Sequence, residues 1–213
     1  PISAFLKSQG AVPAIQIAHA GRKASVRRPW EGGQSLAPGD TDPPWRTVGP
    51  GVDAFGPGWQ TPHALDEKEL DTLAQKFRDT AARAAKAQFE LLELHFAHGY
   101  LAAEFLSAAV NRRSDHFGGS LENRMRFPLQ IVEAVRSIWP ADKPLSVRIS
   151  AIDEGWSLED SVIFARALKA RGVDIIDCSS NGATLKRPVV PAPGYQEPFA
   201  ERIRREAERS EEH

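Results

Sequence analysis

Residues 91–100 have the sequence Leu-Leu-Glu-Leu-His-Phe-Ala-His-Gly-Tyr, in which a short apolar run leads directly into a group of polar and aromatic side chains. The run Leu91–His95 has the length and composition of a buried β-strand, although Glu93 interrupts it. In parallel α/β folds the chemistry sits at the carboxyl ends of the strands, where the loops converge. This stretch therefore predicts a strand and, at its end, a candidate site.

Three further apolar runs have strand character, and helical patterns separate them. These runs are Ala14–His19, Leu145–Ser150 and Ile175–Ser179. Strands that alternate with helices favour a parallel sheet with crossover helices, and we expect residues 1–213 to form a single domain of this kind. Periodicity alone leaves two α/β architectures open, namely part of a (β/α)₈ barrel and a half-size doubly wound sheet.

Capping residues mark the starts of the predicted helices. Asp66 forms a capping box with Glu69 at the start of the first helix, and Ser120 and Ser157 cap the next two. Pro128 lies within the second helix, where it predicts a kink or a late start. The loop before the first of these helices, at about residues 22–65, is rich in Pro, Gly and Trp and is too long for a simple connection. We therefore expect that loop to cover a functional site.

The composition argues against several classes of partner. The chain has 27 basic and 28 acidic side chains and a formal net charge of −1, so no global field favours nucleic acid or an anionic membrane. No stretch approaches the roughly 20 apolar residues that a membrane helix needs. The single cysteine, Cys178, excludes an intramolecular disulfide and suits a reducing compartment. The sequence predicts a soluble, cytoplasmic protein without nucleic-acid or membrane partners.

A glutamine and an arginine lie within otherwise apolar strands. Gln16 falls in the first strand and Arg148 in the third. Both need partners, because an unpaired buried amide costs about 1 to 3 kcal/mol and a buried charge costs more. A polar ligand in a barrel mouth would supply those partners, and so would a structural network with neighbouring carboxylates. Their expected position at equivalent strand depths favours the ligand.

The histidines at the end of residues 91–100 suggest two kinds of site. His95 and His98 could direct two N–H donors at one ligand oxygen, or two nitrogens at a metal ion. A metal would need a third ligand, for which Glu93, Glu104 and Asp115 are available. The span lacks the His-Glu-x-x-His order of helical zinc sites. The residues alone leave open an oxygen-binding pair and a metal-dependent barrel hydrolase.

Two longer motifs resemble those of a known family. Residues 15–23, Ile-Gln-Ile-Ala-His-Ala-Gly-Arg-Lys, resemble the third-strand motif of the Old Yellow Enzyme family of NADPH dehydrogenases. Residues 95–101, His-Phe-Ala-His-Gly-Tyr-Leu, resemble the fourth-strand signature of that family. The similarity continues through residues 104–107, 111–112, 117–120, 122–124, 147–150, 177–180 and 193–196. It covers residues 1–206 and is greatest to the bacterial branch typified by xenobiotic reductases.

The resemblance implies a TIM (β/α)₈ barrel, of which this chain holds about the central four β/α units, family strands three to six. The first two family strands would precede Pro1. The last two, with the groups that hold the FMN phosphate, would follow the helix expected from Pro198. The tail, residues 206–213, is too charged to form a buried parallel strand. We therefore expect a truncated barrel that binds FMN weakly on its own.

The resemblance also implies an activity and roles for individual residues. Family members use FMN to transfer hydride from NADPH or NADH to an activated alkene, enone or nitro acceptor. Gln16 and Arg148 resemble the residues that bind the pyrimidine edge of the flavin, and His95 and His98 resemble the pair that binds the oxygen of the acceptor. Tyr100 resembles the candidate proton donor. The family pattern includes no metal and is compatible with a homo-oligomer, and the remaining alternative is an inactive barrel fragment.

Overall fold

The computed structural model describes residues 2–186 and 192–207. Its main sheet has four parallel strands in the spatial order β1, β4, β5, β6. These strands are Ala14–Ile17, Leu91–Phe96, Leu145–Ser150 and Ile175–Ser179. Each strand lies beside its predecessor in the sheet, whereas a doubly wound sheet reverses its strand order at a switch point. The strand order therefore favours the barrel over the doubly wound alternative.

The helices alternate with these strands, as the capping residues predict. The helices are α1 Ile2–Ser8, α2 Glu67–Lys86, α3 Leu101–Leu106, α4 Leu121–Arg136, α5 Leu158–Lys169 and α6 Glu197–Ala207. Asp66 and Glu69 form the expected capping box of α2, and Ser120 and Ser157 cap α4 and α5. Of the two outcomes predicted for Pro128, a kink or a late start, the late start is wrong, because α4 begins directly after its Ser120 cap and continues through the proline.

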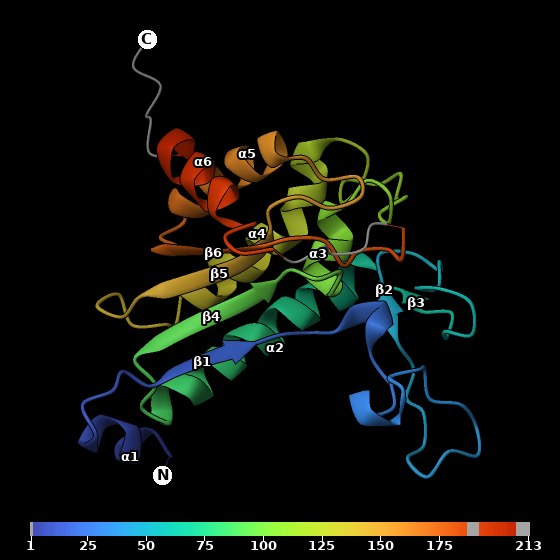
Figure 1. Ribbon diagram of the computed structural model, residues 1–213, viewed down its shortest axis with the longest axis horizontal. Coiled ribbons are helices and arrows are strands. Elements are labelled where there is room, and N and C mark those ends of the chain that lie inside the picture. The colour runs from blue at the N-terminus through green and yellow to red at the C-terminus, as the bar shows by residue number, and fades with distance from the viewer. Residues whose placement is uncertain (1, 187–191, 208–213) are drawn as a thin grey trace.

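The two faces of the sheet differ sharply in polarity. On one face Leu92, Leu94 and Val147 are fully buried in the core shared with the helices, and Figure 1 shows α2 and α4 behind the strands. The opposite face carries polar residues, of which Gln16 is exposed and Arg148 is half-buried. Parallel sheets are normally apolar on both faces. A polar, partly open face therefore indicates the side on which a ligand would bind.

The long loop at residues 22–65 has local structure that the sequence pattern does not predict. It follows the 3₁₀ turn Gly21–Lys23 and contains a second turn, Pro29–Glu31. Two short parallel strands, β2 Val48–Gly49 and β3 His63–Ala64, pair near its end. Leu36 and Leu65 are buried, which anchors the loop against the rest of the protein. That the loop covers a bound ligand remains a prediction.

Two observations bear on the predictions about solvent and compartment. Among residues 2–186 and 192–207, no helix is long and apolar enough to cross a membrane. Cys178 is a free, half-buried cysteine, and burial raises the pKa of its thiol to about 11. Because the thiolate is the reactive form, this cysteine is unreactive at neutral pH. The charged tail predicted for residues 206–213 lies outside the described residues from position 208 onward.

Candidate active site

The two histidines predicted to act together lie side by side at the carboxyl end of β4. His95 is the penultimate residue of the strand and is buried, with only 8% of its surface exposed. His98 follows in the loop with a positive φ of 58°, an uncommon conformation for a residue with a side chain. The ring centroids are 5.0 Å apart at an interplanar angle of 79°. The structure thus brings the pair into direct contact.

Hydrogen bonds define a consistent direction of proton donation through the pair. The Ala97 backbone N–H donates to His95 Nδ1 at 3.3 Å, which leaves the proton of a neutral His95 on Nε2. His95 Nε2 lies 3.3 Å from His98 Nδ1, and His98 Nε2 lies 2.6 Å from Ser179 Oγ. In this arrangement His95 donates to His98, which donates to Ser179. Each ring therefore carries an Nε2–H that a ligand oxygen could compete for.

Burial keeps both rings neutral. It lowers the pKa of His95 to about 4, with further contributions from His98 and Arg148. Burial also lowers the pKa of His98, and the positive charges of Arg148 and Lys23 act in the same direction. At neutral pH each ring can therefore donate one N–H without carrying a net charge. This state suits hydrogen bonding to a carbonyl or nitro oxygen.

Tyr100 lies next to the histidine pair. It is the N-cap residue of α3, and its ring centroid is 4.9 Å from that of His95. The ring is half-buried, and the Lys23 ammonium lies 5.7 Å from its centroid. The Tyr100 ring thus belongs to the same cluster as the two imidazoles.

Gln16 and Arg148 contact neighbouring carboxylates, as the network alternative predicts, but their burial and depth differ from the expectation. Gln16 is exposed rather than buried, because the sheet face that carries it is open, and its amide donates to Glu93 at 2.7 Å. The Nε atom of Arg148 lies 3.2 Å from Asp177 Oδ2. The expectation of equal strand depths is also wrong, since Gln16 aligns with Glu93 whereas Arg148 aligns with His95, two residues further along β4.

The three carboxylates considered as a third metal ligand are engaged elsewhere. Glu93 accepts hydrogen bonds from Gln16 and from Ser146, and Asp115 pairs with Arg113 at 2.5 Å. Glu104 is buried against the turn after β1. Within the described part of the chain, no group of three His, Cys, Asp or Glu side chains is placed to hold a metal ion. The geometry gives no support to the metal-hydrolase alternative.

The sequence reasoning missed Lys23 as a site residue and considered Glu104 only as a metal ligand. Lys23 Nζ donates to the His98 carbonyl oxygen at 2.8 Å and to that of Gly182 at 3.2 Å. Glu104 is fully buried and accepts the backbone N–H of Arg22 at 2.9 Å. Both residues stand within the family-like motifs, which was the available signal. Spacing alone could not connect them, because their partners lie 75 to 159 residues away.

The burial of Glu104 predicts an unusual dependence of stability on pH. Burial raises the pKa of this carboxyl to about 8 from 4.5, so the folded protein holds a proton there that the unfolded chain has already lost. This contribution to stability is complete below pH 4.5 and is lost as the pH rises through 8. The lowered pKa of His95 has the opposite effect, but only between about 4 and 6.5.

We therefore expect the free energy of unfolding to fall between pH 6.5 and 8, by at most about 1.4 kcal/mol per pH unit. Glu104→Gln, which keeps the shape of the protonated side chain, should remove this fall. Urea unfolding followed by circular dichroism across that range would measure it, with the exposed Glu122→Gln as the matched control. A pH profile shared by the wild type and Glu104→Gln would contradict the prediction.

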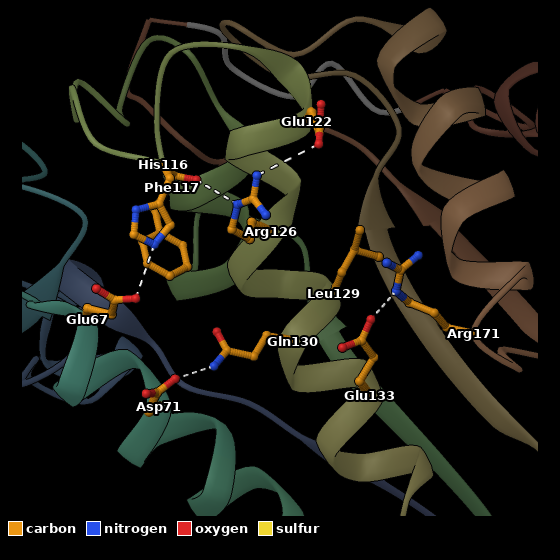
Figure 2. Close-up of a pocket in the computed structure, with 10 residues that line it drawn as sticks. All are labelled: Glu67, Asp71, His116, Phe117, Glu122, Arg126, Leu129, Gln130, Glu133 and Arg171. Atoms are coloured by element: carbon orange, nitrogen blue, oxygen red, sulfur yellow. Dashed lines mark hydrogen bonds and ion pairs between the residues drawn. The ribbon is translucent and has the colours of Figure 1, made fainter.

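A separate polar cavity lies between α2 and α4, and neither His95 nor His98 lines it. It has a volume of about 420 Å³, and Figure 2 shows the side chains that line it. Those side chains pair with one another: Gln130 donates to Asp71 at 2.5 Å, and Arg171 contacts Glu133 at 2.6 Å. Because its polar groups are already satisfied and largely exposed, this cavity is better explained as a helix-helix groove than as a site.

Comparisons with known proteins agree with the geometry. A family model described as the NADH:flavin oxidoreductase / NADH oxidase family matches residues 1–210. An NADPH dehydrogenase of Geobacillus sp. (strain WCH70) is 43% identical over 209 residues, covering 97% of this chain and 56% of that protein. The chain thus spans about half the length of the curated relatives that it matches.

Two solved structures have the same arrangement of strands and helices. A 2-naphthoyl-CoA reductase in complex with 2-naphthoyl-CoA superposes with a TM-score of 0.78 at 26% identity, covering 96% of this chain and 32% of the other. A morphinone reductase in complex with tetrahydroNAD superposes with a TM-score of 0.72 at 24% identity, covering 96% and 56%. The second likeness supports the fold alone. The parallel sheet with its alternating helices is therefore part of a (β/α)₈ barrel, as predicted.

Proposed function

The chain belongs to the NADH:flavin oxidoreductase / NADH oxidase family, and from this we propose that it contributes the flavin-ring and acceptor side of an FMN-dependent NAD(P)H oxidoreductase that reduces an activated alkene. One observation carries the proposal. The polar face of the sheet leads into a pair of neutral, contacting histidines with Tyr100 beside them. A cluster of N–H donors that carries no charge is suited to polarise the oxygen of an uncharged acceptor.

The residues on the open face fit the polar edge of a flavin ring. Arg148 Nε is buried but has no hydrogen-bond partner, because its approach to Asp177 lacks hydrogen-bonding geometry. An orphaned donor of this kind costs free energy unless a ligand binds it. Gln16 offers an exposed side-chain amide, and it aligns with β4 two residues earlier than Arg148 does. We propose that these two residues hold FMN, which when bound would supply the hydride chemistry.

The remaining roles fall to the residues at the end of β4. His95 and His98 would donate hydrogen bonds from their Nε2–H groups to the carbonyl or nitro oxygen of the acceptor. This polarisation would make the alkene carbon that lies further from the oxygen more electrophilic. Tyr100 would deliver a proton from its hydroxyl to the neighbouring carbon. Ser179, which contacts His98 Nε2 at 2.6 Å, would hold that ring in place until an acceptor oxygen competes for the proton.

The proposal extends to the setting of the protein. The acceptors would be small enones, alkenes or nitro compounds, with NADPH or NADH as the hydride donor. We place the protein in the cytoplasm, which is supported by its single cysteine, Cys178.

The test of the proposed function compares flavins with and without a phosphate. We expect the 213-residue chain to bind FMN and riboflavin with similar affinity, more weakly than about 1 µM, because the ring contacts of Gln16 and Arg148 are each worth only about 0.5 to 3 kcal/mol. Titration by flavin fluorescence measures both affinities. With flavin in excess, NADPH should then reduce 2-cyclohexenone above the rate without protein.

Variants separate specific binding from adsorption. Arg148→Met should weaken the binding of both flavins. Arg126→Met, a change on the outer surface of α4, should leave their binding unchanged (Figure 2). Binding that is indifferent to Arg148→Met would contradict the flavin assignment. Flavin binding without enone reduction would contradict the proposed acceptor chemistry.

A further inference from the structure

Lys23 joins three loops at the carboxyl end of the sheet. It ends the turn Gly21–Lys23 that follows β1, and its ammonium binds the carbonyl oxygens of His98, after β4, and Gly182, after β6. The same ammonium lies 4.6 Å from the centroid of the Phe55 ring. A compact ammonium has three donors on one atom and can satisfy two carbonyls at once, whereas a guanidinium is larger and planar, so the two side chains are not interchangeable here.

The backbone at this junction is tightly packed and strained. His98 has a φ of 58°, and its neighbour Gly99 has a φ of 67°. A Cβ on Gly99 would lie only 2.1 Å from the Gly182 carbonyl oxygen, so the two loops touch directly. A left-handed residue other than glycine is held only where its surroundings determine it. The hydrogen bond that the His98 carbonyl accepts helps to keep the backbone in this conformation, and the backbone conformation sets the orientation of the His98 ring.

Glu104 fixes the turn that carries Lys23. Its Oε1 atom accepts the Arg22 N–H, and a Cβ on Gly21 would lie only 2.2 Å from the same oxygen. The Arg22 guanidinium in turn donates to the carbonyl of Ala183 at 2.7 Å, next to Gly182. The turn Gly21–Lys23 is thus held by the buried carboxyl of Glu104 and by the loop after β6.

His98 is held at three points. Its N–H donates to Ser150 Oγ at 2.9 Å, its ring contacts Ser179, and its carbonyl oxygen accepts from Lys23. We propose that Lys23 is a positioning residue, which aims His98 and, two residues later, Tyr100 at the acceptor by binding the carbonyls of His98 and Gly182 together. This inference rests on the proposed function only for its effect on turnover.

The experiment compares Lys23→Met, Lys23→Arg and the exposed Lys68→Met on α2. Histidine side-chain NMR resonances, followed through a pH titration, report the position and pKa of His98 without any cofactor. In Lys23→Met the His98 resonances should move and the pKa of His98 should rise, because a positive charge that lowers it is removed, while Arg148 and His95 still face the ring. Lys68→Met should match the wild type.

Turnover provides the second measurement. We expect Lys23→Met to lower kcat/KM for 2-cyclohexenone by roughly tenfold, less than the 10²-fold that a 1 Å misplacement can cause. Lys23→Arg keeps the charge, so it should preserve the pKa of His98 but still lower kcat/KM, which separates geometry from charge.

The outcomes distinguish the two proposals. His98 resonances, pKa and enone kinetics that all match the wild type in Lys23→Met would overturn the role of Lys23. Shifted His98 resonances in a protein that reduces no acceptor even as wild type would overturn the proposed function and leave the role of Lys23 standing. If Lys23→Met does not fold by circular dichroism, Lys23→Arg carries the test, and its failure to alter either His98 shifts or kcat/KM overturns the role.

Discussion

Replacing His95 or His98 with alanine is expected to lower kcat/KM for an enone acceptor by roughly 10²- to 10³-fold in the flavin-loaded protein. Each substitution removes one preorganised N–H donor from the acceptor oxygen, and a donor of this kind contributes about 2.7 to 4 kcal/mol to transition-state stabilisation. Both rings are neutral and already oriented by hydrogen bonds, so the lost donor cannot be replaced without reorganisation. Steady-state kinetics with 2-cyclohexenone measure the loss.

The double variant gives a sharper test of a shared target. If His95 and His98 donate to the same oxygen, the two losses should not add, because residues that act as a unit are strongly non-additive. NADPH consumption without an acceptor should change much less in all three proteins. His116→Ala, at the outer cavity of Figure 2, is the matched control and should retain full activity. Unchanged enone reduction in both single variants would exclude the pair from acceptor binding.

The elements of the fold were predictable because their signals are local. Residues 145–150 and 175–179 became strands with the predicted bounds, since each is a short apolar run next to a helix end. The caps of α2 and α5 were equally readable, because a capping residue and its partner stand three positions apart. The short helix α3 was not predicted, because its six residues are buried on every side and show no amphipathic period.

The environment of the candidate site could be predicted only in part. The contact between His95 and His98 follows from their spacing at one strand end. The register between strands does not follow from any local pattern, so the offset between Gln16 and Arg148 was misjudged. The role of Lys23 was not predicted for a similar reason, since it depends on the carbonyls of His98 and Gly182, which two separate loops bring together.

Tyr100→Phe is expected to slow enone reduction on the order of 10²-fold if its hydroxyl is the sole proton donor. The substitution keeps the ring that packs 4.9 Å from His95, so the fold of the site should survive. Reduction of ferricyanide, which requires no protonation of carbon, should proceed at the wild-type rate. A loss confined to the enone would therefore locate the defect at proton delivery and not at hydride supply.

The second tyrosine of the chain provides the matched comparison. The Tyr195 hydroxyl accepts a hydrogen bond from Gln196 at 2.8 Å, and the same amide contacts Ser179, the partner of His98. This hydroxyl is thus close to the site but is hydrogen-bonded to Gln196. We therefore expect Tyr195→Phe to retain most of the enone turnover. If Tyr195→Phe lost the 10²-fold and Tyr100→Phe did not, the proton would come from Tyr195. Full activity in both variants would mean that water or another group delivers it, because the sequence has only these two tyrosines.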